Sequence, residues 1–468
     1  MKDSTTPANK TTAFFKKTGR SIAVLLFWLA VWAIAAHWVG KELILPDPLA
    51  TLRRLWQLIG TGEFWQSTLR SLLTILLGFA AGTVFGTLLA VLTARFSAAK
   101  ALCSPMVSVV KATPVASFII LALVFLRRAA VAPFIASLMV FPILWGNVSE
   151  GIRHTDPKLL EKAKVYGVPK AWHIRYIYIP QVFPYFRAGV CTALGLAWKA
   201  GVAAEVLGTP TGTIGEKLRD AQIYLETADL FAWTVVVILL SMIVEALLKK
   251  LMQRVALHDR VHPSDRKPES AEPTGDVTRV LTRSFGSKNV LQKLKITLPE
   301  RGVTALTAPS GGGKTTVLRM LCGLDTASDG TNPAIGEPCA YLFQEDRLLP
   351  QLSVAQNILL VNPAADVETL LKTVELEQEA DSLPTTLSGG MQRRASLAVM
   401  LARVPAAAMV LMDEPFRGLD DAMRDRIAPR IFDAVRGKRV VLVSHAEEEI
   451  ERYADRIVSL SSAAEKEN

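Results

Sequence analysis

The sequence is poor in charge and in cysteine. Only 21% of its 468 residues are charged, whereas 50% are hydrophobic. A soluble chain usually carries about a quarter charged residues, so part of this chain is expected in lipid. Disordered, collagen-like and disulfide-scaffold proteins are excluded. The four cysteines show no CxxC pair and no histidine at metal spacing, which predicts neither zinc nor a disulfide: Cys103, Cys191, Cys322 and Cys339.

Acidic residues are the scarcer charge, and the formal net charge is +10. Such a balance occurs in nucleic-acid-binding proteins. In a membrane protein, however, basic residues gather beside the cytoplasmic ends of helices. We therefore expect contact with membrane lipid and no nucleic acid.

The first half of the chain contains apolar runs long enough to cross a bilayer, which takes about 20 residues. We expect an all-α permease-like domain over 21–255 with six spans, near 21–39, 71–94, 104–126, 129–148, 187–207 and 230–252. The basic tail 1–20 and the basic loop 150–185 are placed in the cytoplasm by the positive-inside rule. No convincing cleavage site follows the first run, so it is interpreted as an anchor.

A polar, proline-containing stretch without periodicity covers 256–275 and predicts a linker. From 276 to 468, short β-type runs alternate with helical patterns, which indicates a soluble α/β domain. No internal repeat of 20–50 residues occurs in either half.

A glycine-rich loop follows the predicted strand 302–307 and precedes a helical pattern. Backbone N–H groups in such a loop curl around phosphates, Lys314 reaches the β- and γ-oxygens, and Thr315 ligates Mg²⁺. Ala308 stands where the strict pattern has its first glycine. The phosphate-binding candidates are Ser310, Gly311, Gly312, Gly313, Lys314, Thr315 and Thr316.

Two further segments suit nucleotide chemistry. The apolar run 409–412 ends in Asp413 and Glu414, which fits one acid for Mg²⁺ and a second for the attacking water. Alone, an acidic strand end is more often a solvated loop. The segment Ser388–Gly390 opens a helix with free N–H groups, although a lone segment of this kind is more often an ordinary N-cap.

Taken together, these segments resemble the ATP-binding-cassette ATPases, and the remaining motifs stand in the same order. Gln344 lies in a segment similar to the Q-loop, Asp420 in one similar to the D-loop, and His445 follows a β-type run as the switch histidine does. Phe285 stands where the family has its adenine-stacking aromatic, although a core role is equally consistent. The family therefore implies a P-loop ATPase that uses ATP and Mg²⁺.

The resemblance also implies a role for each residue. Glu414 would be the catalytic base and His445 the contact to the γ-phosphate, while Thr315, Gln344 and Asp413 would hold Mg²⁺. In this family the signature segment completes the ATP site of a second cassette. The candidates for this are Ser388, Gly389, Gly390, Gln392 and Asp420. Because the chain contains one cassette, a homodimer is the simplest working unit.

The loop before the fifth predicted span resembles the EAA loop of bacterial importer permeases. Its matching positions are Glu161, Ala163, Gly167 and Pro180, with Lys162 where the family has an alanine. The pattern predicts a short amphipathic helix, a glycine stop and a proline break, although a plain surface connector is the alternative. As in importers, the loop would dock on the cassette and carry its closure to the membrane.

Three segments carry a closer resemblance: 45–48 after the first span, Ala197-Trp198 with Ala204-Glu205 in the fifth, and 344–350 in the ATPase part. Among importers, they are most similar to the nitrate, sulfonate and taurine group, which also includes permeases for thiamine-pyrimidine precursors. The resemblance implies import of a small anion across a bacterial inner membrane, with a separate extracytoplasmic substrate-binding protein. A rival interpretation is a non-transport cassette that transmits force or a signal to an envelope partner. Another is an energising module for a separately encoded membrane subunit.

Two charges fall within or near the fifth predicted span, Lys199 and Glu205. A charge inside a membrane is costly unless it is paired or hydrated, so each is a candidate for the solute path. Pairing with another helix is the structural alternative, and the sequence leaves both open.

Overall fold

The computed structural model describes residues 8–255, 261, 269–285, 288–309, 311–328 and 334–460. The chain divides into two compact units. The first contains 1–154 and 182–256, and the second contains 155–181 and 257–468. The predicted coupling loop therefore belongs largely to the compact unit of the α/β domain rather than to the helical unit.

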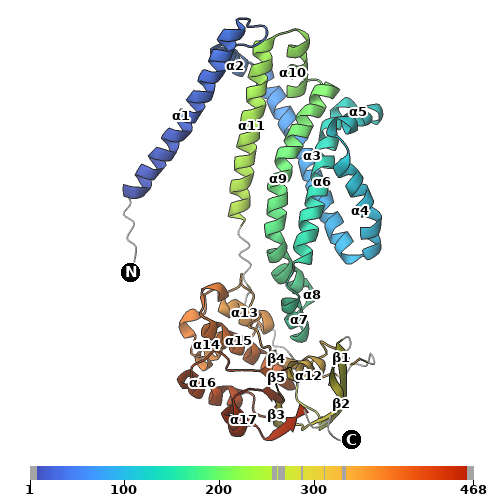
Figure 1. Ribbon diagram of the computed structural model, residues 1–468, viewed down its shortest axis with the longest axis vertical. Helices are drawn as coiled ribbons and strands as arrows, with labels where there is room; N and C mark the ends of the chain where they lie inside the picture. The colour runs from blue at the N-terminus through green and yellow to red at the C-terminus, as the bar shows by residue number, and fades with distance from the viewer. Residues whose placement is uncertain are drawn as a thin grey trace. The chain divides into compact units, whose positions relative to one another are not determined.

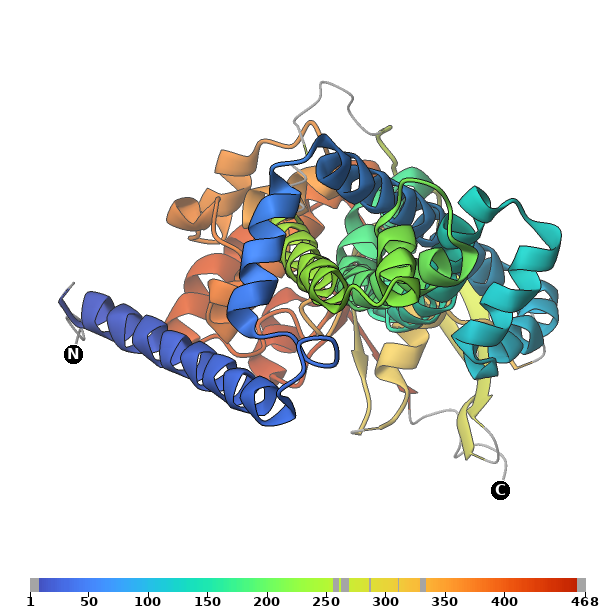
Figure 2. The same cartoon turned by 90° about the horizontal axis from the view of Figure 1, so that it is seen from above.

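The helical unit is built from helices that follow one another through short turns (Figure 1). They are α1 (Ala8–Val39), α2 (Pro48–Ile59), α3 (Gly62–Arg95), α4 (Ser97–Ala112), α5 (Val115–Phe125), α6 (Arg128–Arg153), α9 (Ile179–Gly208), α10 (Ile214–Ile223) and α11 (Thr227–Arg254). Within this unit, α1 and α2 lie on one side and α4 and α5 on the other (Figures 1 and 2).

Four helical runs among the described residues are long and apolar enough to span a membrane: α3, α6, the run Lys170–Gly208 and α11. The pair α4–α5 makes a fifth if it is counted as one bent span. The first predicted span lies in α1, which includes the apolar helical segment Leu26–Val39 among the described residues. By length and composition, the described residues thus hold four or five such spans, and the six expected spans stay a prediction.

The segment expected as the span 104–126 is not one continuous helix. α4 and α5 are bent by 107° where Thr113 and Pro114 separate them. The residue before a proline is driven out of the helical region by contact with the ring. Thr113 accordingly adopts an extended ψ of 132°, so the helix ends in the middle of the apolar run.

The closest packing in this unit joins α3 to α6 through a glycine stripe. Gly78, Gly82 and Gly86 recur every four residues and lie on one face of α3. A Cβ atom at Gly82 would come 2.6 Å from the carbonyl oxygen of Ser137 in α6. The missing side chains therefore let the two backbones touch, as small residues do in membrane helices.

The second unit contains two sheets. β1 (Val277–Phe285) and β2 (Lys288–Leu298) form an antiparallel pair. β3 (Gly302–Thr307), β4 (Cys339–Leu342), β5 (Met409–Asp413), β6 (Arg439–Val443) and β7 (Arg456–Ser459) form a parallel sheet in the order β4-β5-β6-β3-β7. Every residue of β4, β5 and β6 is buried, which matches strands covered on both faces.

Short and medium helices cover this sheet. They are α7 (Pro157–Val165), α8 (Lys170–Trp172), the π-helix η1 (His173–Tyr178), α12 (Lys314–Leu321), α13 (Val354–Val361), α14 (Val367–Thr373), α15 (Gly389–Arg403), α16 (Asp421–Ala434), α17 (Glu447–Tyr453), and the 3₁₀ turns η2 (Glu377–Glu379), η3 (Pro384–Thr386) and η4 (Val404–Ala406). The β1–β2 pair lies at the opposite end of this unit from α14 (Figures 1 and 2).

Most of the expected linker lies outside the described residues, but its last part is attached to the α/β domain. The Lys438 ammonium donates to the Ala271 carbonyl at 2.6 Å, and the buried Arg439 guanidinium donates to the Gly275 carbonyl.

Candidate functional site

The parallel sheet brings the predicted ATPase motifs to one edge. The P-loop follows β3, Gln344 follows β4, Asp413 and Glu414 end β5, and His445 follows β6. Carboxyl ends of parallel strands meet at the same edge of a sheet, where α/β proteins bind ligands. Motifs that are up to 131 residues apart in the chain, from Lys314 to His445, are thereby neighbours in space.

The P-loop has the backbone that phosphate binding requires. Gly311 and Gly313 adopt φ values of 78° and 87°, which side-chain-bearing residues rarely reach. A Cβ atom at Gly312 would come 2.8 Å from the Cβ atom of Ala308, so the turn has no room for a side chain at position 312. Ser310 lies outside the described residues.

Lys314 and Thr315 open α12 directly after this loop. The buried Lys314 ammonium donates to the Ala308 carbonyl at 2.7 Å. The Thr315 hydroxyl donates to Asp413 Oδ2 at 2.8 Å. A hydroxyl and a carboxylate in contact are oxygen ligands of the kind that Mg²⁺ takes, so the residues present fit this metal.

The three candidate catalytic side chains meet at Glu414. The Gln344 amide donates to Glu414 Oε1 at 3.2 Å, and Nε2 of His445 lies 3.3 Å from the same oxygen. Glu414 itself has a φ of 50°, which is unusual for a residue with a side chain. Strained backbone of this kind concentrates at functional sites.

Arg393 holds this arrangement together and was not anticipated from the sequence. Its buried guanidinium donates to the carbonyl oxygens of Phe343, Asp413, Glu414 and Pro415, which flank both the Q-loop and the acidic strand end. Its position in the signature helix, five residues after Ser388, was the available signal. Arg393 is a positioning residue, because none of these contacts reaches a reacting atom.

Burial also affects the acidic pair. It raises the pKa of Asp413 above its ordinary value, and the charge of the adjacent Glu414 acts in the same direction. The hydrogen bond from Thr315 and the Arg393 charge oppose this shift. A divalent cation would stabilise the same ionised carboxylate.

The signature segment caps α15. The Ser388 hydroxyl accepts from the Met391 N–H at 3.3 Å, and the Gln392 amide donates to the Leu387 carbonyl. A Cβ atom at Gly389 would meet no other atom within 4 Å, so this segment is open. Asp420 likewise caps α16 by accepting from the Met423 N–H. No hydrogen bond between the signature segment and the P-loop occurs among the described residues.

Glu161 of the coupling loop forms hydrogen bonds to residues near the ATPase motifs. Its carboxylate accepts two hydrogen bonds from Arg319 of α12, at 2.9 and 3.0 Å, and one from Arg347 beside the Q-loop at 2.8 Å. The hydrogen bonds from Arg319 and then Arg347 hold the pKa of Glu161 at about 2. Lys158 adds an ion pair to Glu345 at 2.6 Å.

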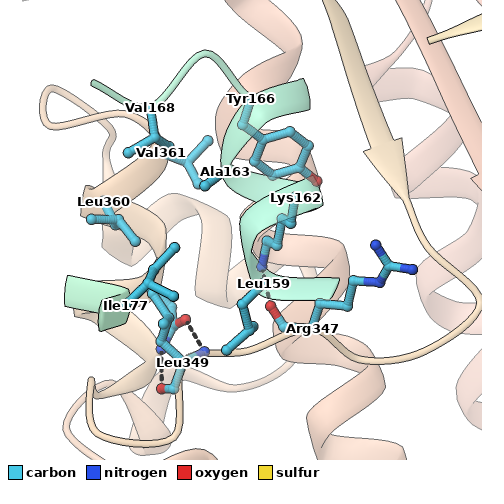
Figure 3. A pocket seen from close by; sticks show the side chains of 11 residues that line it. Leu159, Lys162, Ala163, Tyr166, Val168, Ile177, Arg347, Leu349, Leu360 and Val361 are labelled. Atoms are coloured by element: carbon cyan, nitrogen blue, oxygen red, sulfur yellow. Dashed lines mark hydrogen bonds between the residues drawn. The ribbon is translucent and has the colours of Figure 1, made fainter. Parts of the chain in front are cut away.

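Figure 3 shows how the next turn of α7 is seated. The Lys162 ammonium donates to the Arg347 carbonyl at 2.7 Å, and the buried Tyr166 hydroxyl donates to the Tyr341 carbonyl at 2.9 Å. Burial lowers the pKa of Lys162 to about 7, and the nearby Arg347 charge contributes. The departure from the family's alanine at this position therefore places a titratable amine inside the docking contact.

The other three coupling positions have local explanations. Ala163 is buried, and Gly167 ends α7 with a φ of 65°. The expected proline break is wrong, because Pro180 lies within the continuous run Lys170–Gly208. The wider π-turns of His173–Tyr178 directly precede it, and such turns accommodate irregular helical hydrogen bonding.

A cavity of about 380 Å³ lies between the predicted coupling loop and two candidate metal ligands, Thr315 and Gln344. Its lining includes Lys158, Glu161, Thr315, Arg319 and Gln344. Residues of the coupling loop and of the candidate nucleotide site therefore line the same cavity.

The two charged candidates of α9 differ in environment. Glu205 is fully buried, and its Oε2 accepts from the Ser71 hydroxyl at 2.7 Å and the Gly215 N–H at 3.2 Å, near the start of α10. Lys199 is exposed on the helical unit. Glu205 is thus hydrogen-bonded to α3 and to the start of α10, whereas Lys199 is exposed, and the solute-path role of each stays a prediction. The side chain of Phe285 lies outside the described side chains.

Comparison with known families matches both parts of the chain. Residues 291–417 match the ABC transporter family. Residues 82–257 match the family described as binding-protein-dependent transport system inner membrane component. The two functional parts of an importer thus occur in one polypeptide.

Curated relatives resemble the ATPase part. An aliphatic sulfonates import ATP-binding protein of Nocardia farcinica is 38% identical over 199 residues, covering 41% of this chain and 80% of the relative. One of Granulibacter bethesdensis is 42% identical over 186 residues, covering 38% and 76%. A solved dimeric cassette, MJ0796 with ADP and Pi, is 27% identical over 39% of this chain and 91% of that chain, with a TM-score of 0.34.

The chain therefore belongs to the ABC transporter family. It is an ABC importer whose permease and ATPase parts are joined in one chain, and it hydrolyses ATP coupled to transport.

Proposed function

We propose that two copies of this chain form an importer of the bacterial inner membrane for a small anion, such as a sulfonate, taurine or nitrate. A separate extracytoplasmic protein would capture the solute and deliver it. The substrate class is supported by the aliphatic sulfonates in the names of the relatives and by the exposed cation of Lys199 in an apolar helix.

The ATPase step uses the groups gathered at the sheet edge. Lys314 and the P-loop N–H groups bind the phosphates of ATP. Thr315, Asp413 and Gln344 would hold Mg²⁺, which would neutralise developing phosphate charge. Glu414 Oε1 accepts a proton from the attacking water, and His445 orients the γ-phosphate. Gln344 and His445 both contact the Oε1 atom of Glu414, and this arrangement supports these roles.

A second copy completes each ATP site. In the signature segment Ser388–Gly390, Ser388 and Gly389 are exposed, and no hydrogen bond to the P-loop occurs among the described residues. Its N–H groups at the start of α15 suit an anion. We assign these groups to the γ-phosphate held by the partner's P-loop, which makes closure of two cassettes depend on ATP.

Closure reaches the permease through Glu161. Because this carboxylate binds α12 and the Q-loop together, a movement of either element displaces α7. The coupling loop continues directly into α9 along the chain. The bifurcated contact of Glu161 is the observation that carries the assignment of coupled import.

Uptake of labelled ethanesulfonate, taurine and nitrate by cells with and without the protein tests the substrate class. We expect uptake of at least one anion that depends on ATP and on Glu414. Uptake only of a thiamine-pyrimidine precursor would replace the substrate class. If no solute enters and native purification recovers an envelope enzyme but no solute receptor, the force-transmitting alternative is correct.

A further inference from the structure

The bend between α4 and α5 places a second lysine inside the apolar layer of the helical unit. Lys111 is the penultimate residue of α4, directly before the bend at Thr113 and Pro114. A helix that is interrupted within a membrane is tolerated where its free backbone groups meet protein or water rather than lipid. In the sequence, Lys111 lies within the expected span 104–126.

Lys111 and Lys199 lie at similar depth along α6. Val110, the neighbour of Lys111, packs against the apolar cluster that contains Phe141, and so does Leu138. Ala200, the neighbour of Lys199, belongs to the apolar cluster that contains Met139. These α6 residues lie roughly 15 Å or more from either end of the helix, given its rise per residue. Both lysine backbones are therefore near the middle of the helical layer.

Neither lysine has a carboxylate partner among the described residues. The Lys111 ammonium lies 5.8 Å from the centre of the Trp145 ring, and both side chains are exposed on the surface of the single chain. Glu245 of α11, by contrast, is paired with Lys249 at 2.6 Å. Because an unpaired ammonium in hydrocarbon is costly, the surfaces that carry Lys111 and Lys199 should meet water, an anion or the partner chain rather than lipid.

We propose that Lys111 and Lys199 are two cationic positions of one aqueous path, at which a sulfonate-type anion is bound in passage. This inference rests on the proposed import function and names its anion-binding side chains. A lysine ammonium is a compact charge without bidentate geometry, so two of them attract anions of different shape. Lys111 is the new assignment, and Trp145 is placed to orient its ammonium.

Thiol labelling tests the path without requiring transport. In a full chain whose four native cysteines are replaced by serine, Lys111→Cys and Lys199→Cys are treated with thiol reagents carrying either an ethylsulfonate or a trimethylammonium group. The proposal expects both positions to react, with the anionic reagent favoured. Adding Lys199→Met to Lys111→Cys, and Lys111→Met to Lys199→Cys, should lower that preference about threefold or more.

The matched control is Leu77→Cys, an exposed apolar position of α3 that should stay unlabelled if it faces lipid. Absence of labelling at Lys111→Cys, with the same protein yield, would mean that Lys111 extends through lipid toward the interface and would overturn the proposal. Labelling with no change in preference after the second substitution would also overturn it, because the two charges would then not act on one path.

Uptake separates this inference from the proposed function. Lys111→Met should lower ethanesulfonate uptake at least tenfold, Lys111→Arg should retain most of it, and ATP binding should persist in both. If the unmodified protein imports none of the three anions, the proposed substrate class fails, while the labelling result still decides whether the two lysines share a path.

Discussion

Glu414 is the residue whose loss should separate nucleotide binding from hydrolysis. Its carboxylate contacts Gln344 and His445, and no contact of it with Lys314 or Thr315 occurs among the described residues. Glu414→Gln keeps the shape of the side chain and removes the proton acceptor. We expect ATP binding to persist and turnover to fall by about 10²-fold or more, as for loss of a general base. Steady-state ATPase and nucleotide-binding assays on the solubilised full chain measure this.

The matched control is Asp433→Asn. Asp433 is an exposed carboxylate of α16 that pairs with Arg436, so its neutralisation should leave turnover within about twofold. Near-normal turnover of Glu414→Gln would show that another group accepts the proton.

Arg393 gives a prediction about stability. Arg393→Met removes a buried guanidinium and leaves the carbonyl groups of Phe343, Asp413, Glu414 and Pro415 without this donor. The change should destabilise the α/β unit by about 3 kcal/mol or more. Thermal unfolding of the full chain should show a clearly lower melting temperature, whereas Arg436→Met, at an exposed position, should not. Equal melting temperatures for the two variants would refute the role of Arg393.

The contrast between Glu414 and Arg393 shows what sequence could predict at this scale. Glu414 stands in a contiguous motif whose chemistry is readable from its neighbours. Arg393 acts through backbone carbonyls contributed by two distant loops, and no local pattern records such partners. The same holds for Glu161, whose position was predicted but whose contact with Arg319 depends on the folded arrangement of α7 and α12.

α7 is the element whose attachment can be weakened without touching the nucleotide site. Glu161→Gln removes the charge that binds Arg319 and Arg347 together. We expect ATP hydrolysis to continue while solute uptake falls about tenfold. A tenfold change is the size of effect that a typical coupling free energy produces. Parallel measurements of uptake and ATPase in proteoliposomes test this, with Lys164→Gln, at an exposed position of the same helix, as control. An equal loss of both activities would place Glu161 in the ATPase step instead.

Lys162 should make this attachment depend on pH. Docking lowers its pKa from an ordinary 10.5 to about 7 through burial, so between these values the docked loop binds fewer protons than the free loop. Raising the pH from 7 therefore favours docking. Glu161, with a pKa of about 2, stays ionised and adds no dependence above pH 6.

We expect the ratio of uptake to ATP hydrolysis to rise between pH 7 and 9 in the unmodified protein, measured in the same vesicles. Lys162→Met should remove this rise while retaining the contact of Glu161. A rise of equal size in Lys162→Met would mean that another group titrates.

At the element scale, the strands and the motif order were predictable because buried parallel strands are short, continuous apolar runs. The spans were less predictable. Hydrophobicity reports that a segment is apolar but not that Pro114 divides α4 from α5, nor that the π-turns of η1 carry the helix through Pro180. The glycine stripe of α3 was readable in sequence, since its spacing puts Gly78, Gly82 and Gly86 on one face.

At the scale of the whole molecule, the proposed dimer would divide each ATP site between two chains. The P-loop and the catalytic side chains share one sheet edge, while Ser388–Gly390 caps a separate helix and is open. This division predicts that complementary defects in two chains can restore one site. A chain with Lys314→Ala and a chain with Ser388→Arg should each be inactive as homodimers.

Coexpression of the two variants provides the decisive measurement. In a mixed dimer, the intact P-loop of one chain faces the intact signature of the other, whereas the second site carries both defects. With random pairing and independent sites, ATPase activity should recover to about a quarter of the unmodified level. Differently tagged chains purified in tandem isolate the mixed dimer. If that species stays inactive with normal yield and folding, the signature does not act in trans, and Ser388–Gly390 serves its own chain or α15 alone.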